Sequence, residues 1–399
     1  MHETVLLETI AVGLAVAFVG GMLVQRMGLP PLLGYLFAGV AVGPFTPGFV
    51  ADQKIASELA EIGVMLLMFG VGMHFSIRDL WAVRGIALPG AVAQIVAATA
   101  LGAALGVFWG WPLAGALLFG LALSVASTVV LLRALESTGR LNTEEGRIAV
   151  GWLIVEDLVM VLVLVILPAL VEAVDPGAAS AASDAATDGL LTTLGIALAK
   201  IAGFVAFMLI VGRKVFPWIL QQVEKTGSRE LFTLAVVSLS LGVAFIAAAL
   251  FDVSFALAAF FAGVVLNESD LSHRAAGDLQ PLQDIFAALF FVAVGMLFDP
   301  WILVKQPLHV LAVVAIIVIG KSLAAFAIVR VLGYSRETAV TVSAALAQIG
   351  EFSFILATMG VALRVLPAEG QSLILAGALI SIMLNSFIFR ILSRAMRAA

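Results

Sequence analysis

The chain has 399 residues, of which 62% are hydrophobic and only 12% are charged, and its mean hydropathy is +1.16. These values exclude an ordinary soluble globular protein. The net charge of −5 gives no indication of a nucleic-acid partner, and the absence of cysteine excludes disulfides and thiolate metal sites.

Apolar segments of roughly 20 residues, the length that crosses a ~30 Å hydrocarbon layer, recur along the whole chain. The amino terminus has no basic region or cleavage site of a signal peptide, so we expect the first segment to be a retained span. The thirteen candidate spans are residues 5–24, 31–50, 57–75, 85–107, 112–132, 148–170, 190–212, 230–250, 253–267, 284–298, 306–329, 337–358 and 369–390. The sequence therefore predicts an all-α polytopic membrane protein with a single transport domain over residues 1–399.

Basic residues gather in alternate loops between these spans, as the positive-inside rule requires. With the first loop in the cytoplasm, that side receives 16 of the 21 Lys and Arg residues: Arg26, Arg78, Arg84, Arg133, Arg140, Arg147, Arg213, Lys214, Lys225, Arg229, Arg274, Arg330, Arg336, Arg390, Arg394 and Arg397. We therefore expect the amino terminus outside and the carboxyl terminus in the cytoplasm.

The chain also repeats itself. "FAGV" occurs at residues 37–40 and again at 261–264, and "LLMFGVGMHF" at 66–75 resembles "LFFVAVGMLF" at 289–298, an offset of 223 or 224. This offset is seven spans, and an odd number of crossings reverses orientation. The sequence thus predicts two inverted repeats, residues 1–172 and 230–396, joined by a linker helix at 190–216, an arrangement typical of secondary transporters.

Two adjacent acids, Glu156 and Asp157, lie in the middle of the sixth span. A charge at that depth costs on the order of 3 kcal/mol, so it usually faces a wet cavity or a partner. Neighbouring helical positions point about 100° apart, so the two acids cannot both aim equally well at one spot. We expect Asp157 to be the central ligand, with Glu156 turned toward the neighbouring helices. Such a pair suits exchange of a proton for a cation. The alternative is that one or both acids only pair with a basic residue and lock the bundle.

Other polar residues at membrane depth complete the prediction. Lys321, in the eleventh span, is a candidate partner that pairs with Asp157 until a cation displaces it, or else a structural lysine. Two stretches related by the same offset, at spans 5 and 12, are polar and rich in small residues, so we expect unwound helices there. Their candidate site residues are Ser127, Thr128, Gln348 and Glu351, although the hydroxyls of the first two also fit bonds to their own helix.

These residues resemble those of the Kef-type branch of the bacterial monovalent cation:proton antiporters. The resemblance covers essentially the whole chain and is most specific in residues 66–95, 124–136, 151–160, 251–269 and 344–357. It implies a sodium/proton antiporter-like fold in the bacterial inner membrane, with a dimerisation part, a mobile core part, and crossed, broken helices at spans 5 and 12. It further implies a homodimer, with the ion and the proton carried by Asp157.

The resemblance also concerns regulation. Residues 267–284 resemble an acidic cytoplasmic regulatory loop, with Glu268, Asp270, His273, Arg274 and Asp278, although a merely solvated loop fits as well. Relatives of this kind carry a nucleotide-binding regulatory domain after the last span. This chain contains no Gly-rich nucleotide-binding fingerprint. We therefore expect the regulatory domain or subunit to be a separate partner, and the chain to be either a truncated or a naturally short form. We expect no cofactor beyond the transported ions.

The residues themselves admit potassium or sodium as the cation, because Glu156 stands where the best-studied Kef systems have glutamine. A gated cation channel without proton coupling is the main alternative function, but the chain has no repeated filter sequence. An enzyme is disfavoured, since the four histidines lie at loops or membrane edges and cysteine is absent. A sensor without transport is the remaining alternative.

Overall fold

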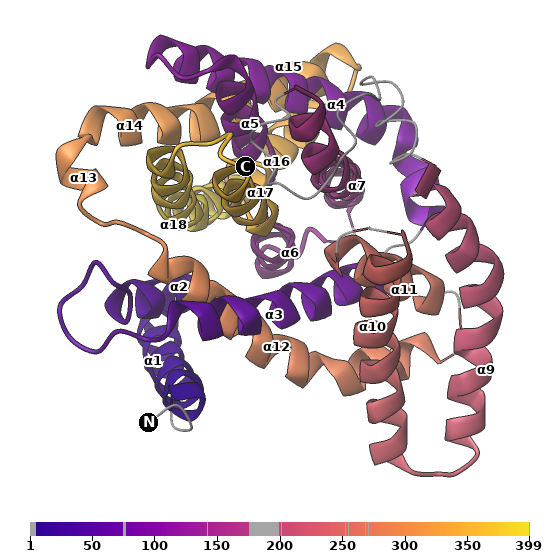
Figure 1. Ribbon diagram of the computed structural model, residues 1–399. Helices are drawn as coiled ribbons and strands as arrows, with labels where there is room; N and C mark the ends of the chain where they lie inside the picture. The colour runs from indigo at the N-terminus through magenta and orange to yellow at the C-terminus, as the bar shows by residue number, and fades with distance from the viewer. Residues whose placement is uncertain are drawn as a thin grey trace. The chain divides into compact units, whose positions relative to one another are not determined.

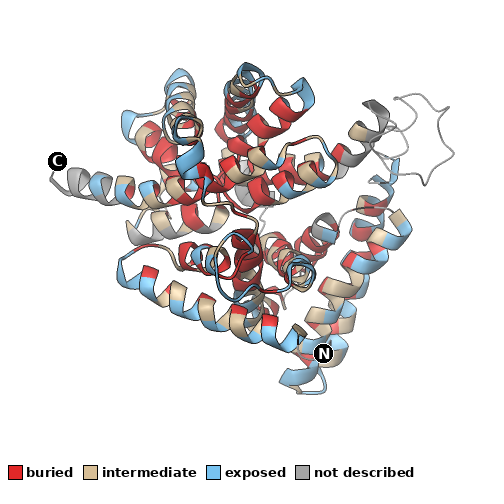
Figure 2. Cartoon of the chain, turned by 60° about the vertical axis from the view of Figure 1, so that its left-hand side comes forward, coloured by how far each residue is buried: buried red, intermediate tan, exposed pale blue. Residues whose placement is uncertain are grey.

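The computed structural model describes residues 5–398 except for 75–76, 142, 175–198, 201, 252, 254, 268 and 270. All regular secondary structure in this part of the chain is helical. Eight of the described helices are long and apolar enough to cross a membrane, and shorter apolar helices accompany them. Figure 2 shows both buried and exposed residues along most helices, as expected where one side packs on protein and another faces lipid.

The helices follow the chain in the order shown in Figure 1. The first half contains α1 (Val5–Arg26), α2 (Pro31–Ala41), α3 (Gln53–His74), α4 (Ile77–Phe108), α5 (Leu113–Ser124), α6 (Thr128–Ser137) and α7 (Glu144–Val174). The second half contains the π-helix η1 (Met208–Gly212), α9 (Arg213–Glu224), α10 (Arg229–Phe251), α11 (Phe255–Asn267), α12 (Ser272–Met296), α13 (Ile302–Lys305), α14 (Pro307–Ala315), the π-helix η2 (Ile316–Gly320), α15 (Lys321–Val331), α16 (Arg336–Ala345), α17 (Glu351–Ala362) and α18 (Ala368–Ala398).

The chain divides into two compact units. Unit 1 consists of residues 1–17, 49–76 and 161–293, and unit 2 of residues 18–48, 77–160 and 294–399. In unit 1, α3 and α11 pack closely through Gly72 and Gly263. A Cβ added to Gly72 would overlap the Phe260 carbonyl, and one added to Gly263 would overlap the Phe69 carbonyl. Small residues let these two backbones approach each other, as is common between helices in membranes.

Unit 2 contains both interrupted helices. The chain leaves helical geometry at residues 125–127, between α5 and α6, and again at residues 346–350, between α16 and α17. Helix α4 packs against α5, with Gly102 and Gly120 in backbone contact. The predicted broken helices at spans 5 and 12 are therefore confirmed, as is the all-helical fold.

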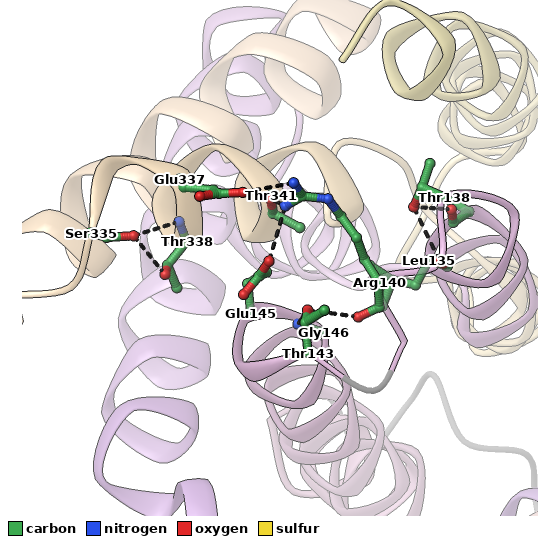
Figure 3. A network of polar contacts seen from close by, with 11 residues as sticks. Leu135, Thr138, Arg140, Thr143, Glu145, Gly146, Ser335, Glu337, Thr338 and Thr341 are labelled. Carbon is green, nitrogen blue, oxygen red and sulfur yellow. Dashed lines mark hydrogen bonds and ion pairs between the residues drawn. The ribbon is translucent and has the colours of Figure 1, made fainter. Parts of the chain in front are cut away.

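A polar network ties three elements of unit 2 together away from the breaks (Figure 3). Arg140, in the connection between α6 and α7, donates from Nη1 to Glu145 Oε1 at 3.0 Å and to Thr341 Oγ1 at 2.8 Å, and from Nη2 to Glu337 Oε1 at 2.7 Å. Gly139, with φ +68°, turns the chain at the end of α6 so that the Arg140 N–H bonds to the Leu135 carbonyl. The network joins α6 and α7 to α16.

Most predicted spans coincide with described helices, but several boundaries are corrected. Helix α4 begins at Ile77, before the predicted residue 85, and α18 continues to Ala398, beyond the predicted residue 390. The predicted span 31–50 ends as a helix at Ala41, because Gly43 and Pro44 follow the C-cap residue Val42 and favour a turn. Residues 272–284, predicted to be part of a loop, form the beginning of α12. Their charged residues and Pro281 indicated a loop, but alanine and leucine between them support a helix that continues through the proline.

Two predictions concern residues that lie partly or wholly outside the described part of the chain. Residues 190–198 of the predicted linker helix lie outside them, and the helical structure near its far end runs on through η1 and α9 to Glu224. Glu268 and Asp270 of the predicted regulatory loop also lie outside them. The division into inverted repeats stays a prediction.

Candidate functional site

Helix α7 carries both membrane acids, and both are buried, with exposed fractions of 0% for Glu156 and 3% for Asp157. Glu156 Oε2 accepts a hydrogen bond from the Ala126 N–H at 2.9 Å, and Asp157 Oδ2 accepts one from Thr128 Oγ1 at 3.0 Å. Glu156 thus meets the middle of the unwound segment 125–127, whereas Asp157 meets the first residue of α6, in agreement with their angular separation on α7.

The first break frees backbone groups that side chains then bind. Helix α5 ends at Ser124, and Val125 is extended, so the N–H groups of Ala126 and Ser127 have no helical acceptors. Glu156 accepts from the Ala126 N–H, and Gln348 Oε1 accepts from the Ser127 N–H at 2.9 Å. Helix α6 then begins with the bond from the Leu131 N–H to the Ser127 carbonyl.

The second break lies directly against the first. Gln348 bonds to both backbone groups of Ser127, because its Nε2 also donates to the Ser127 carbonyl at 3.2 Å. Gly350 is extended and lies so close to Ser127 that a Cβ there would overlap the Ser127 backbone. The two interrupted helices therefore cross at Ser127 and residues 348–350.

Lys321 is fully buried at the start of α15, directly after the π-helix η2. Its Nζ donates to the Gln348 carbonyl at 2.9 Å, and the carboxylate with which it interacts electrostatically is Glu156. Asp157 interacts electrostatically with Glu351 and Glu156. The structure therefore connects Lys321 to the crossing and to Glu156, whereas the predicted partner is Asp157.

The four half-helices α5, α6, α16 and α17 each have a polar side chain near the end that lies at the crossing. Carbonyl ends carry partial negative charge and N–H ends partial positive charge, so donors suit the first and acceptors the second. At the carbonyl ends, Gln94 Nε2 donates to Ser124 O at 2.9 Å and Asn385 Nδ2 to Ala344 O at 2.7 Å. At the N–H ends, Glu156 binds near the start of α6, and Glu351 is the first residue of α17.

Several buried carboxylate oxygens accept no hydrogen bond from the described residues: Glu156 Oε1, Asp157 Oδ1, and both oxygens of Glu351. Such atoms are costly in a low-dielectric interior unless a proton or a cation neutralises them. Hard oxygen donors of this kind, with the Thr128 hydroxyl beside Asp157, suit a monovalent cation or a proton. No cluster of metal-binding type occurs among the described residues.

The structure brings together the seven predicted membrane residues, which are Ser127, Thr128, Glu156, Asp157, Lys321, Gln348 and Glu351; all lie in unit 2. The described residues of the predicted regulatory loop form a different cluster in unit 1. There Asp278 accepts from Arg229 at 2.8 Å, and Arg274 pairs with Glu224 at 3.3 Å and lies over the Phe232 ring at 4.3 Å. His273 is on the same helix.

Sequence reasoning missed Gln94, Trp152 and Asn385, all of which are buried. Trp152 Nε1 donates to Gln94 Oε1 at 3.2 Å, so these two extend the network of the crossing. The available signal was an amide in the middle of an otherwise apolar span, which applies to Gln94 and Asn385. An indole gives no such signal, because tryptophan is common in apolar segments.

Comparison with known proteins agrees with this geometry. The profile of the family described as "Sodium/hydrogen exchanger, transmembrane" matches residues 14–395. The chain belongs to this family. The predicted resemblance to cation:proton antiporters is thereby confirmed at the level of the family.

Individual relatives and a solved structure also resemble this chain. It is 60% identical over 393 residues to YbaL of Escherichia coli K12, provisionally named a cation/proton antiporter, covering 98% of this chain and 69% of YbaL. It is 30% identical over 389 residues to K(+) efflux antiporter 4 of Arabidopsis thaliana, covering 97% of this chain and 64% of that protein. The fold matches the sodium proton antiporter MjNhaP1 of Methanocaldococcus jannaschii with a TM-score of 0.71, at 16% identity and 97% coverage of both chains.

Proposed function

We propose that this protein is a secondary antiporter that exchanges a monovalent cation, potassium, for protons by alternating access, with Asp157 as the shared carrier. The observation that carries the proposal is the placement of Asp157 against Thr128 at the crossing of two interrupted helices. One Asp157 oxygen accepts from Thr128, and the other accepts no hydrogen bond from the described residues. A single buried carboxylate of this kind holds either a proton or a cation, and this competition couples the two fluxes.

Potassium is proposed because two relatives over nearly the whole chain are named K(+) efflux antiporters. Glu156, Lys321, Ser127, Gln348 and Glu351 would shape the site around the carrier. The network at the crossing supports this assignment, because each of these side chains contacts or neighbours the unwound backbone.

We also infer the setting of the transporter. The distribution of basic residues supports an outside amino terminus and a cytoplasmic carboxyl terminus in a bacterial inner membrane. The family resemblance supports a homodimer and a cytoplasmic regulatory domain or subunit as partner. The cluster of Arg274 and Asp278 on α12 is a candidate contact for that partner.

The proposal is tested by measuring proton movement in proteoliposomes on addition of potassium, sodium, lithium or rubidium. Asp157→Asn should abolish exchange for every cation while the protein stays folded, because an amide binds neither a proton nor a cation as a carboxylate does. Glu144→Gln is the matched control, since it makes the same change at an exposed position of the same helix. Exchange at the wild-type rate in Asp157→Asn would refute the carrier. Cation flux without proton movement in the wild-type protein would instead indicate a channel.

A further inference from the structure

Gln94 joins two elements of the site without belonging to either broken helix. It lies on α4 with no exposed surface, its Nε2 donates to the Ser124 carbonyl at 2.9 Å, and its Oε1 accepts from Trp152 Nε1 at 3.2 Å. One amide thus spans from the last residue of α5 to helix α7. A fully buried amide that uses both its donor and its acceptor in this way has its orientation fixed.

The Trp152 ring is held just as firmly. It is completely buried, and Gly90, one helical turn before Gln94 on α4, leaves the space that the ring fills. A Cβ at Gly90 would overlap the ring atoms. Helix α4 therefore holds the face of the indole with Gly90 and its N–H with Gln94.

Trp152 is also one helical turn before Glu156 on α7, a spacing that makes the two side chains neighbours. Glu156 Oε2 accepts from the Ala126 N–H, while its Oε1 accepts no hydrogen bond from the described residues. Ser124 and Ala126, on either side of Val125, are thus held by Gln94 and by Glu156. Trp152 connects these two side chains, because it bonds to Gln94 and lies one helical turn from Glu156 on α7.

We propose that Gln94 and Trp152 are positioning residues that set the cation affinity of this transporter by fixing Glu156 and residues 124–126, where α5 ends and the unwound segment begins. The proposal rests on the proposed antiport function. Neither residue binds the ion. They act because a cation site works best when its oxygen ligands are already in place, so that binding does not have to order them.

The experiment measures initial rates of exchange against potassium concentration in proteoliposomes for Trp152→Phe, Gln94→Met and the double variant. Each single variant should raise the KM for potassium on the order of 2- to 10-fold, the range for one lost hydrogen bond, and should largely keep the maximal rate. The double variant should be no worse than the more affected single one, because the same chain of bonds is broken only once. Trp111→Phe and Gln371→Met make the same changes outside the network and should leave KM unaltered.

A merely structural role would give a different pattern. It would lower the melting temperature and the maximal rate, leave the KM for potassium unchanged, and give additive effects in the double variant. Either an unchanged KM or additive effects would overturn the proposal. If Gln94→Met does not fold, Gln94→Asn keeps the amide but cannot reach both partners, and the same rise in KM is expected.

Failure of the proposed function would be visible separately. A wild-type protein without cation-dependent proton movement refutes antiport, whatever the variants do. Potassium-dependent increase in melting temperature then tests the positioning role alone, since a bound ligand stabilises the folded state. The variants should need about 2- to 10-fold more potassium for the same increase. Equal requirements in wild type and variants overturn the proposal.

Discussion

Lys321 has two tasks at the crossing that a substitution can separate. Its ammonium donates to the Gln348 carbonyl, and its charge acts on Glu156. The first task needs only a donor, whereas the second needs a positive charge. The choice between a structural lysine and a lysine that participates in ion exchange therefore depends on which task matters for transport.

Lys321→Ala removes both tasks, and Lys321→Gln keeps a donor but no charge. A buried carboxylate that has lost a nearby positive charge is harder to ionise, so both variants should need a higher pH for exchange. The shift should be on the order of one pH unit, which corresponds to about 1.4 kcal/mol. Only the alanine variant should also lower the melting temperature clearly, because it leaves the Gln348 carbonyl without its donor.

The measurement is the rate of exchange as a function of pH at matched protein amounts, together with thermal unfolding of each variant. If Lys321→Ala lowers the melting temperature but the pH profiles of the wild type and both variants coincide, Lys321 has only a structural role.

At the scale of the elements, the two interrupted helices depend on connections far from the crossing. Arg140 is 14% exposed and Glu145 16%, whereas Glu337 is 61% exposed. The contacts of Arg140 with Glu145 and with the buried Thr341 are therefore shielded from water, and its contact with Glu337 is not. Their contributions to stability should differ accordingly.

We predict that Arg140→Ala destabilises the protein by about 1–3 kcal/mol, because it leaves Glu145 and Thr341 without their shared donor. Glu337→Ala should cost at most about 1 kcal/mol, since it removes an exposed ion pair. Thermal unfolding in one detergent compares the two variants with the wild type. Equal losses of stability would show that the network in Figure 3 acts as a single unit, contrary to this ranking.

The interrupted helices could be predicted from the sequence because polar and small residues stand at membrane depth at two positions separated by the repeat offset. Their limits, 125–127 and 346–350, could not, because a helix in an apolar stretch ends where tertiary contacts replace its own hydrogen bonds. The contact between Gln94 and Trp152 joins residues 58 positions apart and depends on how α4 lies against α7. No periodicity within one segment contains that information.

The 100° between neighbouring helix positions predicts different surroundings for Glu156 and Asp157, and the structure gives the two acids different partners. The choice of Asp157 as carrier stays a prediction. The pairing of Lys321 was not predictable in the same way. The sequence offers three acids at membrane depth, Glu156, Asp157 and Glu351, as partners of Lys321. Only their arrangement in space shows that Glu156 is the one that interacts with it.

For the whole molecule, the division into units separates two kinds of polar cluster. The candidate ion site lies entirely in unit 2, and the ion pairs of Arg229, Arg274 and Asp278 lie in unit 1. Different substitutions can thus test the proposed ion site and the proposed contact with a regulatory partner separately. The proposed regulatory contact also depends on the orientation of the chain, because a cytoplasmic partner requires α12 to begin on the cytoplasmic side.

The absence of cysteine makes this orientation directly testable. Lys225, after α9, and Lys305, at the end of α13, are both exposed, and the basic-residue distribution places them on opposite sides of the membrane. Lys225→Cys and Lys305→Cys are therefore a matched pair with identical chemistry, and the unaltered chain is an unreactive background. In intact bacterial cells a membrane-impermeant maleimide should label Lys305→Cys only, and permeabilised cells should label both. Labelling of Lys225→Cys in intact cells, with Lys305→Cys protected, would reverse the topology and place the start of α12 outside, where no cytoplasmic domain could reach it.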